Sequence, residues 1–355
     1  MLRRLLRKLA GGPGGLGLGP VDDRLFVALA YHMILGRPPD PKGQARYTAE
    51  LAAGDMSRRN LLDLLMASDE ARHLGDRPVG QRLAALEDNL ANLLKRRYAA
   101  VAAAGDPAAR LRSHEFKVHS QHGEDGILLY LFSLVGAATH QVVEFGIEDG
   151  RECNAANLII NFGWRGLLMD CVPENVEAAQ RYYAQRLGPA ADRVAIDLQQ
   201  VSPENIDQLL AARGLAGEID LLSIDIDGND YWVFEAISQV EPRVVVIEYN
   251  ASLGPRRAAA VRPAPDFNRF ACHPSGYYHG ASLAAMAKLG RQKGYALVGC
   301  DSSGANAFLV RRDLLSDQLP EQEPAACFYP HRRRTAAEPL EQQMRLTAEM
   351  DFIEV

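Results

Sequence analysis

Acidic residues gather where two buried strands of the expected sheet end. The run SIDIDGNDYW contains Asp225, Asp227 and Asp230, and the following strand ends at Glu248, with Asn250 two residues later. Carboxylates this close repel one another unless something neutral or positive compensates them. Oxygen donors of this kind suit Mg²⁺ or Mn²⁺ rather than zinc. The predicted metal ligands are Asp225, Asp227, Glu248 and Asn250.

A divalent ion at this position would lower the pKa of a substrate hydroxyl and orient it. Asp225 and Asp227 are therefore predicted catalytic residues. His279, which precedes a helix on the same side of the sheet, is the third, as a base or a metal ligand. An alternative remains open, in which Asp225 contacts a ligand or a backbone amide while Asp227 and Asp230 cap the next helix.

A glycine-containing loop follows the first expected strand, in the run VVEFGIEDG. Gly146 and Gly150 allow a tight turn and a close approach of a ligand to the backbone. Glu148 stands where many nucleotide sites have glycine, and its carboxylate would repel a pyrophosphate. Asp170 ends the second strand, 26 residues after Glu144 (170 − 144), where an acidic side chain can accept hydrogen bonds from a ribose diol.

Further residues are expected to contact the same adenosine-bearing ligand. Asp197, after the third strand, is placed to receive an adenine amino group, and Gln121 lies in a polar run before a helix. The full predicted cofactor-binding set is Gln121, Glu144, Gly146, Gly150, Asp170, Asp197 and Asp225.

Strands and helices alternate from about residue 111 onward. Apolar strands such as VVVIE and DLLSI are typical of a parallel sheet covered on both faces. The expected parallel strands are Gln141–Phe145, Gly166–Asp170, Val194–Ile196, Ile219–Ile224 and Arg243–Glu248. Two more, Tyr295–Cys300 and Ala307–Arg311, are joined by so short a turn that they must be antiparallel. Five parallel strands closed by such a hairpin form the Rossmann-like α/β sheet of class I methyltransferases.

The N-terminal part is expected to be a small all-α module. One helical pattern ends at Gly36 and a second ends near Gly54, and Ser57 caps the start of a third. The segment from Tyr31 to Ala71 resembles the helical module DUF4214, which often accompanies bacterial glycan-modifying enzymes. The matching residues are Tyr31, Leu35, Gly36, Arg37, Asp40, Gly43, Tyr47, Leu51, Gly54, Ser57, Ser68 and Glu70.

The domain prediction has five parts. They are a flexible basic and Gly-rich tail at 1–20, the DUF4214-like module at 21–78, a connecting helix and linker at 79–110, the Rossmann-like domain at 111–315, and a C-terminal extension at 316–355. The tail interleaves arginines with leucines and could contact an anionic membrane surface weakly. The connecting helix carries a short leucine stripe, so a homodimer is a minority expectation.

The larger domain resembles the FkbM-type class I methyltransferase family over about residues 115–313. The matching runs are SQHGEDGI, VVEFGIEDG, GWRGLLMD, LLSIDIDGNDYW, VVVIEYN, GASL and GYALVGCDSSGANAFLV. The resemblance implies S-adenosylmethionine (SAM) as cofactor, held by Glu144, Gly146, Gly150 and Asp170. FkbM relatives more often have one Asp followed by a Val-Glu-Gly run, whereas a second Asp precedes Gly228 here.

Composition excludes some classes of protein and leaves others open. A net charge of −6 and 47% hydrophobic residues fit a globular protein without a nucleic-acid partner. Five cysteines without CxxC pairs favour reduced thiols and a cytoplasmic location, and no apolar run predicts a transmembrane segment.

The leading hypothesis is O-methylation of a sugar or glycan hydroxyl by direct transfer from SAM, with a small-molecule or glycan acceptor. One alternative is a non-catalytic Rossmann-like module that binds a glycan or a protein. An NAD(P)-linked oxidoreductase is disfavoured by Glu148 and by the terminal hairpin.

Overall fold

The computed structural model describes residues 23–70, apart from 36 and 38, and residues 111–355, apart from 266. The chain divides into two compact units, residues 1–101 and 102–355. The predicted tail at 1–20 and connecting segment at 79–110 lie outside the described residues. No helix among the described residues has the length and apolarity needed to cross a bilayer.

The smaller unit contains three helices, α2 (Asp23–Leu35), α3 (Pro41–Ala53) and α4 (Arg58–Met66). The backbone amides at the start of α3 bond to the side chain of Asp40, and Ser57 accepts the amide of Asn60 in α4. These caps satisfy donors that a helix start leaves without a partner. Buried side chains from all three helices form one apolar core, as predicted for this module.

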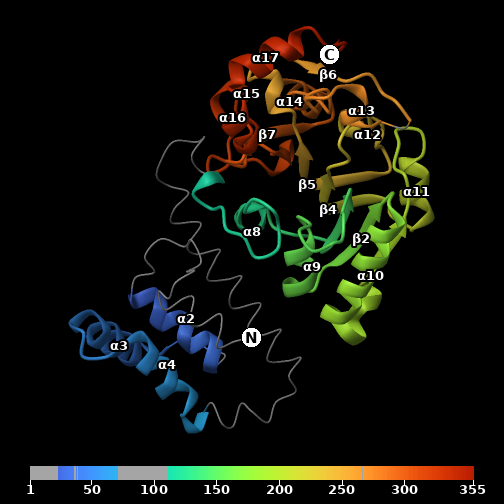
Figure 1. The fold of residues 1–355 in the computed structure, drawn as a ribbon. Helices are drawn as coiled ribbons and strands as arrows, with labels where there is room; N and C mark the ends of the chain where they lie inside the picture. Colours follow the sequence, from blue (N-terminus) through green and yellow to red (C-terminus); the bar gives the residue numbers. More distant parts are fainter. Residues whose placement is uncertain (1–22, 36, 38, 71–110, 266) are drawn as a thin grey trace. The chain divides into compact units, whose positions relative to one another are not determined.

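The larger unit is built on a seven-stranded sheet in the order β3-β2-β1-β4-β5-β8-β7 (Figure 1). Strands β1 to β5 are parallel, and β8 pairs antiparallel with both β5 and β7. The predicted fold class is therefore confirmed. The strands are β1 (Gln141–Phe145), β2 (Arg165–Asp170), β3 (Val194–Leu198), β4 (Gly217–Ile224), β5 (Val240–Glu248), β7 (Tyr295–Cys300) and β8 (Asn306–Arg311).

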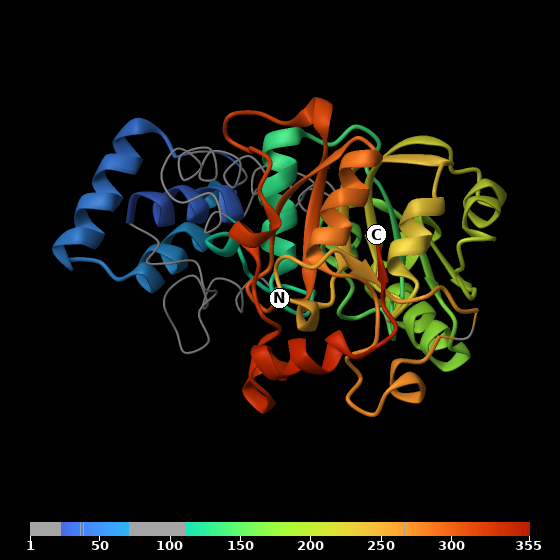
Figure 2. The same cartoon turned by 90° about the horizontal axis from the view of Figure 1, so that it is seen from above.

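Helices pack on both faces of this sheet (Figures 1 and 2). Side chains of α11, α12 and α14 join the strands in one large apolar core, and full burial of strands on both faces explains their uninterrupted apolar sequences. The helices are α8 (Glu124–Val135), α9 (Ala156–Phe162), α10 (Pro173–Leu187), α11 (Ile206–Ala212), α12 (Asp230–Ala236) and α14 (Leu283–Gln292), with the short η1 (Gly188–Arg193) and η3 (Arg312–Leu314).

The segment after β5 and the C-terminal residues pack together beside the sheet. β6 (Ala259–Ala260) pairs antiparallel with β9 (Ile353–Glu354), which brings the C-terminus next to β6 (Figure 1). This small second sheet was not predicted, because two-residue strands leave no period in a sequence. The remaining elements are η2 (Ala251–Leu253), α13 (Arg269–Cys272), α15 (Pro324–Cys327), α16 (Arg332–Ala337) and α17 (Leu340–Ala348).

Candidate functional site

The carboxyl edge of the sheet brings three predicted residues to one place. Glu144 in β1 is in register with Leu168 of β2 and Ser223 of β4. Asp170 and Asp225 follow two residues after these partners, on neighbouring strands. Because parallel strands end at a common edge, Glu144, Asp170 and Asp225 lie where ligands bind in open α/β sheets.

Gly146 holds the loop after β1 against the loop after β4. Its φ of 73° lies in the left-handed region, and a Cβ atom there would stand 1.6 Å from the backbone carbonyl oxygen of Asp225. Its amide also donates to Met169 at 2.9 Å. Glycine is required at this position because two backbones meet.

Protein donors already occupy the carboxylate of Glu144. It accepts the backbone amides of Asn154 and Ala155, each at 2.8 Å, and the hydroxyl of Ser223 at 3.2 Å. Burial raises the pKa of Glu144 to about 7 against the effect of these donors. Glu144 therefore fixes the turn into α9, and its predicted contact with a cofactor stays a prediction.

Asp170 ties the glycine loop to β2. One carboxylate oxygen accepts the amide of Glu148 at 2.8 Å, and the other accepts the amide of Val172 at 2.9 Å and the side chain of Asn175 at 3.2 Å. A carboxylate has about four acceptor positions, so capacity for a further donor remains. Gly150 serves packing, since a Cβ there would meet Ala179 at 2.9 Å.

Two predicted cofactor residues have different surroundings. Asp197 pairs with the guanidinium of Arg213, whose Nε donates to it at 2.7 Å. Gln121 is exposed, and its carbonyl accepts Lys117 at 3.5 Å in the loop before α8. Neither side chain belongs to the groups formed by Asp225, Asp227, Asp230, Glu248 and His279.

The loop between β4 and α12 presents Asp225 and Asp227 and is held by Asp230. The buried Asp230 accepts the amides of Ile226 at 2.8 Å and Gly228 at 2.9 Å. Asp227 has a φ of 59°, so this residue turns the chain sharply. Neither aspartate caps α12 as the open alternative had it: Asp230 accepts amides of the loop before the helix, and Asp227 pairs with an arginine.

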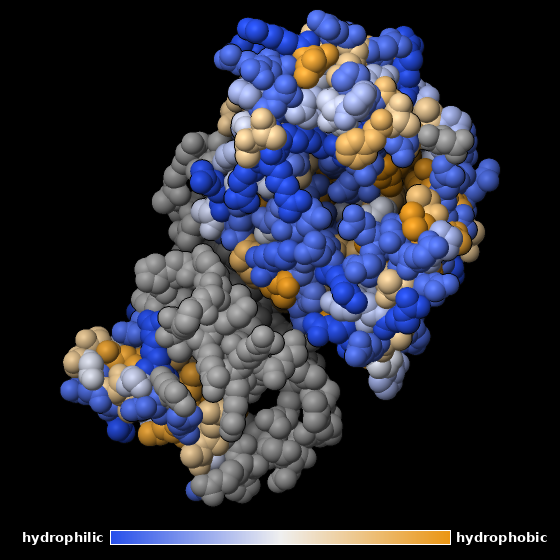
Figure 3. All heavy atoms as spheres, in the orientation of Figure 1, coloured by the Kyte–Doolittle hydropathy of each residue, from blue (hydrophilic) through white to orange (hydrophobic). Residues whose placement is uncertain are grey.

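Asp225 is exposed to solvent although protein surrounds it closely. Desolvation raises its pKa well above the ordinary range, and the negative charges of Glu248 and Asp230 raise it further. Desolvation and the negative charge of Glu248 likewise raise the pKa of Asp230 to about 7. Figure 3 shows a mostly hydrophilic face with a recess bordered by some apolar side chains.

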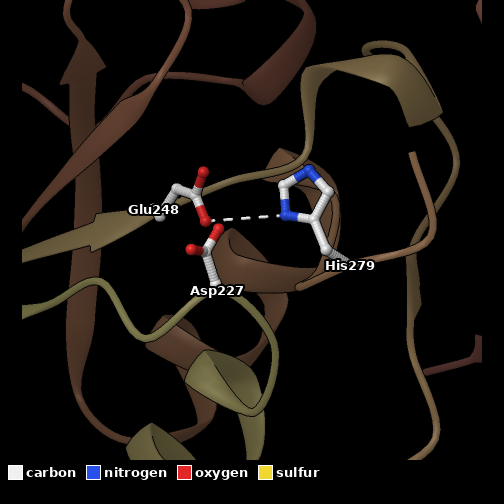
Figure 4. Close-up of side chains that lie close together, drawn as sticks. All are labelled: Asp227, Glu248 and His279. Carbon is white, nitrogen blue, oxygen red and sulfur yellow. Dashed lines mark ion pairs between the residues drawn. The ribbon is translucent and has the colours of Figure 1, made fainter. Parts of the chain in front are cut away.

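Glu248 and His279 face each other beside Asp227 (Figure 4). His279 Nδ1 lies 3.5 Å from Glu248 Oε2, and the His279 side chain is fully buried. Burial lowers the pKa of His279, and the neighbouring carboxylate of Glu248 opposes this shift. Burial raises the pKa of Glu248, but attraction to His279 and Arg334 opposes it, and the net shift is downward.

Two arginines from later segments partly neutralise this cluster. Arg269 donates to Asp227 Oδ1 at 2.5 Å, and Arg334 of α16 lies 3.9 Å from Glu248 Oε1. Arg269 belongs to the segment between β5 and α14, which contains other arginines with different partners. Arg257 and Arg262 pair instead with Glu354 and Asp351.

Among the described residues, two groups have ligand atoms that all lie within 4.8 Å of one another. The predicted ligands Asp225, Asp227 and Glu248 all belong to these groups. The side chain of Asn250 donates to Tyr277 O at 2.7 Å and His279 O at 2.9 Å, so it supports the His279 loop. The groups are Asp227, Glu248 and His279, and Asp225, Asp230 and Glu248.

Sequence reasoning missed Arg334 and the part that Asp230 takes. Arg334 lies 86 residues after Glu248 (334 − 248) in the run HRRRTAA, which has no motif that would link it to β5. Asp230 was assigned to helix capping alone. Its position next to two other aspartates was the available signal, because charge repulsion requires each of them to have a partner.

Comparisons with known proteins agree with this architecture. Residues 170–295 match the family described as the methyltransferase FkbM domain, and residues 17–74 match DUF4214, a domain of unknown function. No curated protein matches the chain. The predicted resemblance is confirmed for both domains, and with it the predicted enzyme class, a SAM-dependent methyltransferase.

Several solved structures are similar in fold. An O-methyltransferase from Bacillus cereus in complex with S-adenosylhomocysteine (SAH) is 15% identical (TM-score 0.35), covering 61% of this chain and 88% of that one. The O-methyltransferase TomG from Streptomyces achromogenes, in complex with SAM, is 14% identical with a TM-score of 0.34. That match covers 66% of this chain and 97% of the other. A protein from Galdieria sulphuraria is 17% identical with a TM-score of 0.34, and the match covers 49% of this chain and 60% of the other.

Proposed function

We propose that this chain, with its FkbM-type methyltransferase domain, transfers the methyl group of SAM to a hydroxyl oxygen of a sugar or glycan. One observation carries the proposal: Asp225 is an exposed carboxylate in close protein surroundings, and its backbone touches the glycine loop. An acceptor hydroxyl next to Asp225 would therefore lie close to a cofactor bound at Gly146 and Asp170.

Asp225 is the residue best suited to take the acceptor proton. Its pKa is raised by burial and by neighbouring carboxylates, so the ionised form is a stronger base than an ordinary aspartate. In the transfer, the acceptor oxygen forms a bond to the methyl carbon as the bond from sulfur to that carbon breaks. The hydroxyl proton passes to Asp225, and SAH leaves. The protein supplies alignment and a base.

A divalent cation would assist this reaction. Four carboxylates, Asp225, Asp227, Asp230 and Glu248, face two arginines, and the repulsion among them raises the pKa of Asp225 and of Asp230. A dication would relieve this repulsion and would polarise an acceptor oxygen. Of the four ligands first predicted, Asp227 and Glu248 would hold Mg²⁺ or Mn²⁺, and Asp225 would stay next to the ion as the base. Asn250 would act behind them by positioning the loop of His279.

The assignment of a glycan acceptor is supported by the DUF4214 match, because that module often accompanies glycan-modifying enzymes. A polar, acidic site also suits a neutral polyol better than an apolar acceptor. The second candidate function, a glycan- or protein-binding module without catalysis, is favoured by no separate observation. It differs in one measurable respect, since it requires neither SAM binding nor Asp225.

The test combines cofactor binding with methyl transfer. SAH is titrated calorimetrically into the full chain, and a panel of sugars is then incubated with SAM and enzyme and analysed by mass spectrometry for one added methyl group. We expect SAH binding, and a methylated product that Asp225→Asn no longer forms. Absence of SAH binding at high protein concentration would refute the proposal.

The metal is tested separately. We expect excess chelator to abolish methylation and Mg²⁺ or Mn²⁺ to restore it. Full activity in chelator would remove the cation from the mechanism while leaving methyl transfer intact.

A further inference from the structure

Two buried polar atoms next to Asp227 lack hydrogen-bond partners. His279 Nδ1 and Glu248 Oε2 are both without one, and so is His279 Nε2. Their 3.5 Å separation exceeds the 2.7–3.2 Å of an ordinary N–H···O hydrogen bond. Buried polar atoms without partners are costly, so such a pair indicates a missing ligand.

The spacing of these atoms suits two ligands of one ion. Metal bonds of about 2.1–2.2 Å place neighbouring ligand atoms roughly 3 Å apart and opposite ones roughly 4.3 Å apart. The 3.5 Å pair fits the first case. One carboxylate oxygen of Asp227, one of Glu248 and one ring nitrogen of His279 all lie within 4.8 Å of one another. In Figure 4 the three side chains, which come from three separate segments, converge on one point.

We propose that Asp227, Glu248 and His279 form a mixed carboxylate–imidazole centre that binds a transition-metal dication such as Mn²⁺ in preference to Mg²⁺. This inference rests on the proposed function, because it defines the cation of that same site. An imidazole nitrogen favours transition metals, whereas Mg²⁺ prefers oxygen ligands and retains its water. His279 is then a metal ligand and leaves the role of base to Asp225.

The surrounding arginines limit how the ion is held. Arg334 lies on the Oε1 side of Glu248, which leaves Oε2 for the metal. Arg269 contacts Asp227 Oδ1, so an incoming dication competes with a guanidinium for that carboxylate. Asp227 is an exposed residue, and its side chain can therefore exchange partners without disturbing the core.

The test measures metal binding in the full chain without SAM or acceptor. Mn²⁺ is titrated into the protein after chelator treatment, and bound ion is followed by loss of the free Mn²⁺ paramagnetic resonance signal. We expect one equivalent to bind, and a hundredfold excess of Mg²⁺ to leave most of it bound. Pulsed resonance of the bound Mn²⁺ should show coupling to a ¹⁴N nucleus, which identifies the imidazole without any substitution.

Substitutions supply the matched comparison. Asp227→Asn, which keeps a residue type tolerant of the left-handed backbone, should weaken Mn²⁺ binding at least tenfold, as should His279→Ala. His273→Ala changes a histidine of the same segment whose ring contacts Ser275, and it should have no effect. Absence of Mn²⁺ binding, or bound Mn²⁺ without nitrogen coupling, overturns the inference. Methyl transfer from SAM, measured independently, decides the proposed function.

Discussion

The two halves of the site differ in how fully their carboxylates are used. On the side of β1 and β2, Glu144 and Asp170 accept several protein donors each, most of them backbone amides. On the side of β4 and β5, desolvation and neighbouring carboxylates raise the pKa of Asp225, and Glu248 has an oxygen without a hydrogen bond. Both halves contain buried or enclosed acids, but only the second has a buried carboxylate oxygen without a hydrogen-bond partner.

This difference separates acids that build the site from acids available to a ligand. A carboxylate that accepts backbone amides stabilises a loop and keeps its shape when a ligand arrives. A carboxylate beside other carboxylates is held in an unfavourable state that a cation or a proton relieves. Substitutions on the two sides should therefore have opposite signatures in stability and in activity.

The largest effect is expected on the β4 side. Asp225→Asn should lower kcat/KM for methyl transfer by about a thousandfold, because it removes the base. The thermal midpoint should stay the same or rise, because one of several repelling charges disappears. Steady-state kinetics and thermal unfolding check the two parts. Asp313→Asn, at an exposed ion pair with Arg311, is the control and should change neither. A large loss of stability in Asp225→Asn would contradict the distinction between acids that build the site and acids available to a ligand.

Gly146→Ala should destabilise the fold by roughly 3 kcal/mol or more, because its Cβ would overlap the carbonyl of Asp225 in a left-handed backbone conformation. Chemical denaturation measures this. Gly214→Ala has a comparable φ of 70° but meets nothing within 4 Å, so it should cost only about 1 kcal/mol. If both variants lost the same free energy of unfolding, the backbone conformation alone, and not the contact between the loops, would explain why glycine is required at position 146.

The pH dependence of stability should reveal Glu144. Its pKa is about 7 in the folded chain, above the ordinary value of 4.5. The contribution of Glu144 to the free energy of unfolding is therefore full below pH 4.5 and is lost as pH rises through 7, by about 3 kcal/mol. Denaturation at several pH values should show a steeper decline for the wild type than for Glu144→Gln. If the stability of the two proteins fell equally with pH, the group responsible would be a residue other than Glu144.

The smallest effect is expected at Asp197. Its carboxylate is already paired with Arg213, so Asp197→Asn should raise the KM for SAM by no more than about threefold, the worth of a modest hydrogen bond. A tenfold or larger increase would mean that Asp197 leaves Arg213 and receives the adenine amino group, which is the role first predicted for it. Arg213→Gln separates the two cases, because it frees Asp197 without removing it.

The sequence was informative where a repeating pattern or a strand end determined position. Apolar runs located all seven strands of the main sheet, and the short turn before Asn306 identified the antiparallel hairpin. The side-chain partners were harder to foresee. The contact of Gly146 with the Asp225 carbonyl, and the approach of Arg334 to Glu248, depend on three-dimensional packing between distant segments. No local pattern encodes either contact.

The pairing of β6 with β9 and the position of Arg334 make the acidic cluster depend on segments outside the main sheet. Arg334 lies beside Glu248 only when the helices after β8 are packed in place. Loosening of that packing would leave the cluster with one of its two guanidinium groups, so the charge balance at the edge of the sheet depends on tertiary contacts that the sheet itself does not make.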